Sequence, residues 1–249
     1  MNKLLLLLER IFAYLQGKGY GAETGQREAK LALKLLGSKP TLVFDIGANK
    51  GHWLKFVLDK YPATVGHAFE PQPVCAQALE VRFGDAQNVS IHHNAVSNTE
   101  ATLSLFFDFE GSGLASLSKR KLEHLGIDFS KSVEVKTVIL DNFITAHGIG
   151  QIDIVKIDVE GHELAVFEGM KKVLAGPLPP KVIQFEFGGC NIDTRTYFRD
   201  FYLLFSQQYE IHRQTPFGIM RIDKYLETDE CFRTTNFFLK LKALSCPAR

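Results

Sequence analysis

Four ionisable residues within six positions follow a buried apolar segment, and their types suit acid–base chemistry. They are Asp158, Glu160, His162 and Glu163, at the end of the predicted strand 152–158. Titratable groups crowded at a strand end are costly unless they are paired or used, so the run predicts a functional site. A neutral imidazole can accept a proton near pH 7, which makes His162 the candidate base. Asp158 is the alternative base or a cofactor anchor, and Glu160 is the third catalytic candidate.

A glycine-containing loop follows the strand predicted at residues 41–46. It reads Asp45-Ile-Gly47-Ala-Asn49-Lys-Gly51, and glycine lets a backbone bend tightly and approach a ligand closely. A dinucleotide site has the pattern G-x-G-x-x-G, but two of its three glycines are replaced here, by Asn49 and His52. The loop therefore favours an aminoacyl cofactor without phosphates, whose ammonium group Asp45 would meet.

Another acidic residue, Glu70, comes directly after the next predicted strand, residues 64–69. Glu70 lies 25 residues after Asp45, near the place where an acidic residue binds ribose hydroxyls in nucleotide-binding sheets. Hydrogen bonds to charged groups contribute about 1.5–3 kcal/mol each. A solvated carboxylate at a helix start is the alternative interpretation of Glu70. Together with Asp45 and the glycine loop, the pattern favours cofactor binding.

Two further polar residues are candidates for contact with an acceptor. Ser116 lies in a Gly/Ser-containing segment, residues 111–118, where an ordinary polar loop is an equal alternative. Glu186 ends the strand predicted at 181–187 and points at the same rim as the other acidic groups.

The elements that must position these residues alternate between strand and helix. Strands are predicted at residues 41–46, 64–69, 89–95, 152–158, 181–187, 209–213 and 236–240, and helices at 53–60, 73–83, 164–174 and 194–206. Such alternation predicts a mostly parallel sheet with helices on both faces. The last two strands have no helix between them and should pair antiparallel at one edge. Ligands of such sheets bind beyond the carboxyl ends of the strands.

The segment from about residue 98 to 140 is expected to be a β-rich insertion. Its β-rich runs, 101–107 and 133–139, flank the Gly/Ser-containing segment. Loops of this length within a compact domain are usually functional or mobile.

Composition and charge indicate a globular protein and argue against several other classes. The 249 residues are 45% hydrophobic and 23% charged, as expected for one globular domain. The net charge is +1 without a block of Lys or Arg, so no nucleic-acid partner is expected. The four cysteines form no C-x-x-C pair, which argues against a zinc site or a disulfide framework and suits a cytoplasmic protein.

The N-terminal forty residues are expected to be a helical lead-in to a domain spanning 41–249. The leucine run 4–8 ends at Glu9, has no cleavage site after it, and is far shorter than the roughly 20 residues of a membrane span. Its apolar residues recur at helical spacing, which predicts an amphipathic helix that packs on the core or on a partner chain, as in a homo-oligomer. Weak membrane attachment is the alternative.

Four motifs in order give the chain a family resemblance. They are D-I-G-A-N-x-G from Asp45, F-E-P from Phe69, N-A-V-S from Asn94 and K-I-D-V-E-G-H-E from Lys156. Over about residues 41–187 the chain resembles the FkbM-type family of S-adenosylmethionine-dependent methyltransferases. The resemblance implies the class I, Rossmann-like α/β fold with a seven-stranded sheet. It also implies S-adenosyl-L-methionine as cofactor and O-methylation of a hydroxyl on a saccharide or other small metabolite.

The resemblance also assigns roles to individual residues. Those implied for cofactor binding are Asp45, Gly47, Ala48, Asn49, Gly51, Glu70, Pro71, Asn94, Ala95 and Asp158. Those placed toward the acceptor are Glu160, His162 and Glu163.

Three alternatives stay open at this stage. A divalent metal could bind the acidic run 158–163, but these residues are too close in sequence to converge without a second segment, so no metal is expected. An NAD(P)-dependent oxidoreductase is disfavoured by the missing glycines. A non-catalytic module of the same fold is disfavoured by the cost of unused carboxylates.

Overall fold

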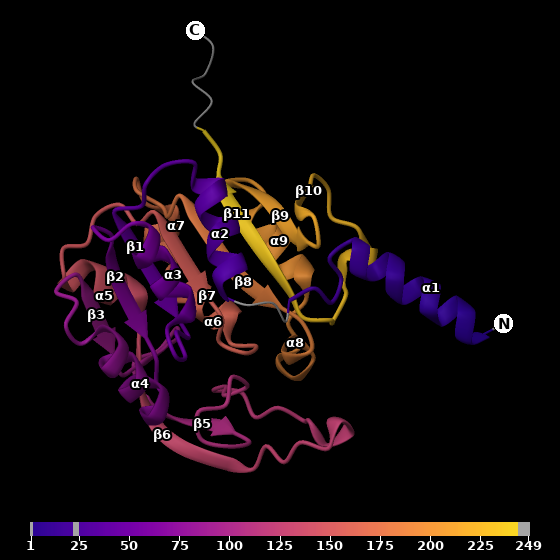
Figure 1. The fold of residues 1–249 in the computed structure, drawn as a ribbon, viewed down its shortest axis with the longest axis horizontal. Helices are drawn as coiled ribbons and strands as arrows, with labels where there is room; N and C mark the ends of the chain where they lie inside the picture. The colour runs from indigo at the N-terminus through magenta and orange to yellow at the C-terminus, as the bar shows by residue number, and fades with distance from the viewer. Residues whose placement is uncertain (1, 22–24, 244–249) are drawn as a thin grey trace, which may run out of the picture.

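The computed structural model describes residues 2–21 and 25–243 and contains a central sheet of eight strands (Figure 1). The strand order is β10-β9-β11-β8-β7-β1-β2-β3. The strands are β1 (Leu42–Ile46), β2 (Val65–Phe69), β3 (Val89–His92), β7 (Ile154–Ile157), β8 (Val182–Phe187), β9 (Tyr209–Thr215), β10 (Gly218–Ile222) and β11 (Thr235–Leu241). Neighbours from β8 through β3 are parallel, and β11 is antiparallel to β8 and β9. The α/β class, the mostly parallel sheet and the antiparallel C-terminal strands are confirmed.

The number of strands differs from the predicted seven by one. β10 adds an edge strand that pairs antiparallel with β9, so β9 and β11 lie inside the sheet instead of at its edge. Sequence reasoning missed β10 because Gly218 begins it and its residues are mostly half-buried or exposed, which gives no clear apolar alternation.

Helices cover both faces of the sheet, because successive strand residues point to opposite faces. Val43 packs with α2 (Gly25–Leu36), α3 (His52–Lys60) and α4 (Pro73–Phe83). Phe44 belongs to the core of the other face. The helices of that face are α5 (Leu140–Ala146), α6 (Glu163–Glu168), α7 (Lys171–Ala175) and α9 (Phe198–Phe205). The remaining helical segments are α8 (Cys190–Thr194), η1 (Glu123–Leu125) and η2 (Glu227–Asp229).

Two predicted helices are shorter or interrupted. The helix expected at 164–174 is divided into α6 and α7 around Gly169, where a Cβ atom would lie 2.3 Å from the Ser97 carbonyl oxygen. The helix expected from residue 194 begins at Phe198, because the Tyr197 N–H is capped by the Asp200 carboxylate.

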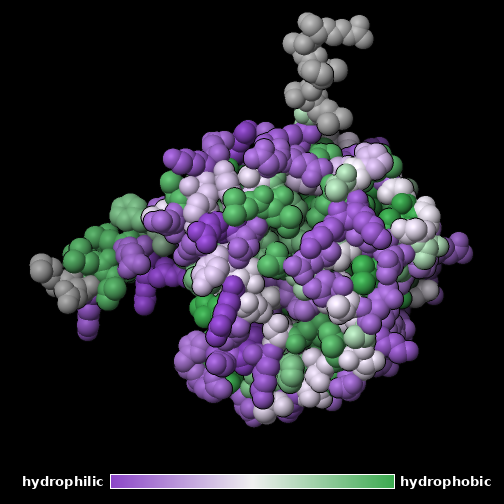
Figure 2. Space-filling model, turned by 180° about the vertical axis from the view of Figure 1, so that it is seen from behind, coloured by the Kyte–Doolittle hydropathy of each residue, from purple (hydrophilic) through white to green (hydrophobic). Residues whose placement is uncertain are grey.

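The N-terminal helix α1 (Asn2–Leu15) forms as predicted but does not pack on the core. It projects from the body (Figure 1), and its large apolar side chains from Leu4 to Leu15 are exposed (Figure 2). The expected packing on the chain's own core is therefore wrong, while a partner chain stays a prediction. Within the described residues, no helix is long and apolar enough to cross a membrane.

The insertion forms a second, three-stranded sheet next to the strand ends of the first. Its order is β4 (Ala95–Val96), β6 (Lys131–Val138) and β5 (Thr102–Phe107), with β5 and β6 antiparallel. The strand predicted at 89–95 is thus divided: β3 joins the main sheet, and β4 joins the insertion. Figure 1 shows β5 and β6 beyond the end of the main sheet where α6 and α8 lie.

Candidate active site

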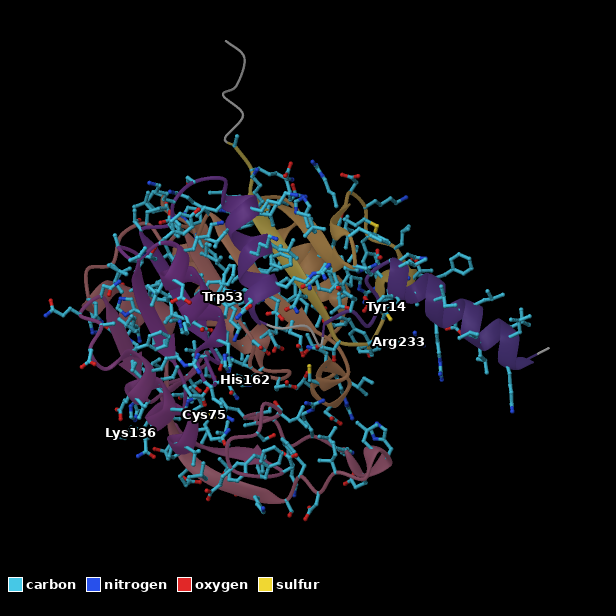
Figure 3. All side chains as sticks on the ribbon, in the orientation of Figure 1. Tyr14, Trp53, Cys75, Lys136, His162 and Arg233 are labelled. Carbon is cyan, nitrogen blue, oxygen red and sulfur yellow. The ribbon has the colours of Figure 1, made fainter. Side chains whose placement is uncertain are left out.

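A cavity of about 210 Å³ lies between the carboxyl ends of β1, β2 and β7 and the insertion. Its position agrees with the rule that ligands bind where the strand order reverses, because the chain continues from β1 toward β2 and later returns to β7 on the other side. The predicted site residues that line it are Gly47, Asn49, Glu70, Pro71, Asn94, Ala95, Ser116, Asp158 and His162. Figure 3 places His162 between the main sheet and the insertion.

The loop after β1 requires glycine at two positions. Gly47 has φ +70°, and a Cβ atom there would lie 1.8 Å from the carbonyl oxygen of Asp158. Gly51 has φ +72°, and its Cβ would lie 2.6 Å from Leu79 on α4. Glycine at these positions lets the loops after β1 and β7 approach each other and lets α3 pack on α4. Gly51 and Ala48 therefore shape the loop from behind and do not line the cavity.

The Glu70 carboxylate joins the loops after β1 and β2. Its Oε2 accepts the Asn49 N–H at 2.7 Å, and its Oε1 accepts the Gln72 N–H at 2.8 Å. Burial raises the pKa of Glu70 to about 7, although the two N–H donors favour the charged form. Each oxygen keeps a second lone pair, so the carboxylate is fixed in place and can still accept hydrogen bonds from a ligand.

The Asp45 carboxylate lies below the cavity instead of on its surface. Asp45 is opposite Lys156 in the β1–β7 register, and Lys156 Nζ lies 3.2 Å from its Oδ1. The same ammonium group lies 3.5 Å from Asp158 Oδ2 and donates to the Gly47 carbonyl oxygen at 2.6 Å. Burial raises the pKa of Asp45, and Lys156 opposes that shift. Asp158, which is 37% exposed, is the carboxylate that reaches the cavity, where the sequence argument had expected Asp45.

The His162 ring is held at the start of α6. Its Nε2 lies 2.9 Å from the hydroxyl oxygen of buried Ser97, which in turn donates to Asn98 Oδ1 at 3.3 Å. Burial lowers the pKa of His162, and the nearby Glu168 opposes that shift only in part. The imidazole is therefore neutral near pH 7, the state that a general base requires.

Glu163 stabilises the turn before α6 and does not face the cavity. Its Oε1 accepts the N–H groups of Gly161 at 3.1 Å and Val159 at 3.2 Å. This supports a turn in which Glu160 and Gly161 have φ values of +54° and +100°. Burial raises the pKa of Glu163 to about 7. The acceptor contact predicted for Glu163 does not agree with this position, because its side chain is fully buried.

Glu160 and Glu186 also lie outside the cavity lining. Glu160 forms an ion pair with Arg120 of the insertion. Burial and the nearby Asp158 raise the pKa of Glu160 to about 8, and Arg120 opposes that shift. Burial and the nearby Glu160 raise the pKa of Glu186 well above its usual value.

Polar contacts that sequence reasoning missed attach the insertion to the strand ends. The Gln72 side chain donates to the Ser112 carbonyl oxygen at 3.2 Å and accepts the Gly111 N–H. Ser116 Oγ donates to the Glu160 carbonyl oxygen at 2.8 Å. The sequence had indicated Ser116 as a candidate for acceptor contact, but for Gln72 the only signal was its position directly after the F-E-P motif. The insertion is thus a wall of the cavity.

Comparison with known families agrees with this geometry. The family model of the methyltransferase FkbM domain matches residues 45–211, which include every strand end around the cavity. The chain belongs to the FkbM methyltransferase family.

The alignments with known methyltransferases cover only part of each relative. The 31-O-demethyl-FK506 methyltransferase FkbM of Streptomyces tacrolimicus is 31% identical over 156 residues, and the match covers 52% of this chain and 59% of that protein. The 2-O-methyltransferase NoeI of Sinorhizobium fredii is 26% identical over 152 residues, with 57% and 62% covered. The chain thus matches about six tenths of the length of these relatives. The crystal structure of methyltransferase FkbM from Methylobacillus flagellatus has a TM-score of 0.49 at 14% identity, covering 81% of this chain and 44% of that one.

The buried glutamates of this FkbM-family chain predict how its stability depends on pH. The folded-state pKa values of Glu28, Glu70 and Glu163 are about 7, above the value of 4.5 for unfolded Glu. Their contribution is therefore full below pH 4.5 and is lost as the pH rises through 7. His162 acts in the opposite direction, but only below about pH 6.5.

We therefore expect the free energy of unfolding to fall between pH 6.5 and 8. Each excess proton bound by the folded state contributes about 1.4 kcal/mol per pH unit. Denaturant titrations without ligand measure this slope. Glu28 is a buried residue of helix α2, and replacing it with Gln should reduce the slope of stability against pH. The matched change at an exposed residue, Glu134→Gln, should leave the slope unchanged. A stability that is constant or rises over this range would contradict the expectation.

Proposed function

We propose that this FkbM-family protein is an S-adenosylmethionine-dependent methyltransferase that acts on a hydroxyl of a saccharide or other small metabolite. The observation that carries the proposal is the acidic cavity at the ends of β1, β2 and β7. Among the described residues that line it are Glu70 and Asp158, and none is Lys or Arg. A cationic sulfonium with an ammonium group suits such a lining.

The same lining disfavours a nicotinamide dinucleotide. A pyrophosphate requires glycine-rich backbone or basic groups to neutralise its charge. In the first loop, Asn49 occupies the position of the second glycine and His52 that of the third. An oxidoreductase therefore has no observation in its favour.

Each part of the cavity has a proposed role toward the cofactor. Glu70 would accept the two ribose hydroxyls, as its free lone pairs allow. Asp158 would meet the ammonium group, supported from behind by Lys156 and Asp45. The loop at Gly47 and Asn49 would line the methionine end of the cofactor, and Asn94 and Ala95 would lie beside the adenine. These are residues of the resemblance motifs, now brought around one cavity.

His162 is proposed to take the proton of the acceptor hydroxyl. When bound, S-adenosylmethionine supplies a methyl group activated by its positively charged sulfur. If the Ser97 hydrogen is directed to Asn98, Nε2–H of His162 donates to Ser97 Oγ and Nδ1 keeps its lone pair. Nδ1 would then be able to accept the proton that the acceptor hydroxyl loses as it is methylated. Orientation of the reactants contributes most of the remaining rate, up to ~7–11 kcal/mol.

The names of the relatives support the choice of a hydroxyl acceptor. Two specify methylation of an oxygen, at the 2 and 31 positions of their substrates. A third, the hexuronic acid methyltransferase AglP of Haloferax volcanii, is 30% identical over 134 residues, which are 53% of this chain and 51% of that protein. A saccharide or similar polyol is therefore the proposed class of acceptor.

A label-transfer experiment tests the proposal. The protein is incubated with S-adenosylmethionine carrying a labelled methyl group and a panel of glycans and small hydroxylated metabolites. We expect label on at least one hydroxylated acceptor, and a rise in melting temperature with S-adenosylhomocysteine but not with NADH. Either of two results would overturn the proposal. One is a melting shift with NADH alone, and the other is no melting shift with S-adenosylhomocysteine or with NADH.

A further inference from the structure

Three potential metal ligands converge behind the cavity from separate parts of the chain. Glu160 comes from the turn after β7, Glu186 from β8 and Cys190 from the first turn of α8. One carboxylate oxygen of each glutamate and the Cys190 sulfur all lie within 4.8 Å of one another. The acidic run 158–163 lacked a second segment with which to converge, and the end of β8 together with α8 supplies it.

Glu186 is the residue of this cluster whose negative charge is least compensated by its surroundings. Its side chain is more than nine-tenths buried. Within residues 2–21 and 25–243 its carboxylate makes no hydrogen bond or ion pair, and the charged group that acts on it most strongly is the Glu160 carboxylate. A buried carboxylate without a partner is strongly destabilising, and a second carboxylate beside it adds repulsion. Because Glu186 lies within reach of Glu160 and Cys190, its oxygen is directed into the cluster.

An ion pair with the insertion would hold one of the ligands, Glu160, in place. Arg120 Nη1 binds Oε2 of Glu160, which leaves Oε1 available. Ligand side chains in metal sites are commonly fixed by such outer hydrogen bonds.

We propose that Glu160, Glu186 and Cys190 bind a divalent transition ion of the zinc class. Two carboxylates and a thiolate carry three negative charges, which the ion and the Arg120 guanidinium would balance. The thiolate favours Zn²⁺ or Co²⁺ over Mg²⁺ and Ca²⁺, which prefer oxygen ligands. Three protein ligands leave one position of a tetrahedral ion open, as in zinc sites that bind a water or a substrate. The inference concerns ion binding and does not rest on methyl transfer.

Cobalt binding tests the site without any measurement of turnover. The full chain is treated with a chelator, which is then removed, and is titrated with Co²⁺. We expect near-ultraviolet thiolate-to-cobalt absorbance that saturates at one equivalent and is displaced by Zn²⁺ but not by excess Mg²⁺. Cys190→Ser should abolish this absorbance, whereas Cys75→Ser, at a buried cysteine on α4, should retain it. Glu186→Gln should weaken cobalt binding by more than about 100-fold, because loss of a residue that only orients a ligand already costs ~10–100-fold.

Melting curves separate a lost site from a damaged fold. Glu186→Gln keeps the size of the side chain and removes a buried charge, so the ion-free variant should melt at the same temperature as the wild type or higher. Zn²⁺ should raise the melting temperature of the wild type and not that of the variant. The proposal is overturned if the wild type shows no thiolate–cobalt absorbance, if Cys190→Ser retains it, or if zinc stabilises Glu186→Gln as much as the wild type.

Discussion

The Glu70→Ala variant is expected to bind S-adenosylmethionine about 10- to 100-fold more weakly than the wild type. A carboxylate that accepts both ribose hydroxyls contributes about 1.5–3 kcal/mol per hydrogen bond, and each 1.4 kcal/mol is a factor of ten in affinity. The expected loss is smaller than the full sum because burial raises the pKa of Glu70 to about 7, so part of this carboxyl is protonated near neutral pH and accepts fewer hydrogen bonds. Isothermal titration calorimetry measures the change.

Two further variants show whether the effect is local. Glu70→Gln keeps one oxygen acceptor and the shape of the side chain, so its affinity should lie between those of the wild type and Glu70→Ala. Glu80→Ala removes an exposed carboxylate of the nearby helix α4 and should leave affinity unchanged. Because Glu70 also accepts the N–H groups of Asn49 and Gln72, each variant's melting temperature must be measured at the same time. Equal affinity in wild type and Glu70→Ala would exclude Glu70 from the cofactor site.

The His162→Ala variant is expected to lower kcat by about 10²- to 10⁴-fold, the usual contribution of a positioned general base. Its affinity for S-adenosylmethionine should change little, because the proposed contacts of His162 are with the acceptor and Ser97. Single-turnover rates with a labelled methyl donor measure the chemical step, and calorimetry measures binding. This contrast separates a catalytic role from a structural one.

Controls for His162 come from two other residues. His93→Ala removes an exposed histidine and should leave kcat unchanged. Ser97→Ala leaves the imidazole in place but removes the hydroxyl 2.9 Å from Nε2, so kcat should fall by less than in His162→Ala. Wild-type kcat in the His162→Ala variant would show that the acceptor proton is lost to another group.

The sequence by itself determined the parallel part of the sheet and the part of its edge where the cavity lies. The apolar runs before Gly47, Glu70 and Asp158 each have strand length, and helices separate them. Parallel strands joined by helices bring their carboxyl ends to one edge, so these three residues had to lie near one another. Local pattern and chain connectivity were sufficient for this result.

Only the tertiary structure decided which of the acidic side chains reach the cavity. Asp45 lies within its strand, and the β1–β7 register places it opposite Lys156, so the two form a buried pair. Glu163 turns back to bind the N–H groups of its own turn, while Asp158 stays at the surface of the cavity. Spacing along the chain does not encode these directions, because they depend on register and on the positive-φ turn before α6.

Contacts between segments that are far apart in the chain also could not be predicted from the sequence pattern. The cavity wall at Ser116 depends on the hydrogen bond from its hydroxyl to the Glu160 carbonyl oxygen, 44 positions further along the chain. The convergence of Glu160 with Glu186 and Cys190 requires β7 and β8 to be neighbours in a particular register. Exposure of the apolar helix α1 likewise followed from its direction away from the body, which its amphipathic pattern could not specify. Local propensity sets each element, but packing among elements sets what each side chain meets.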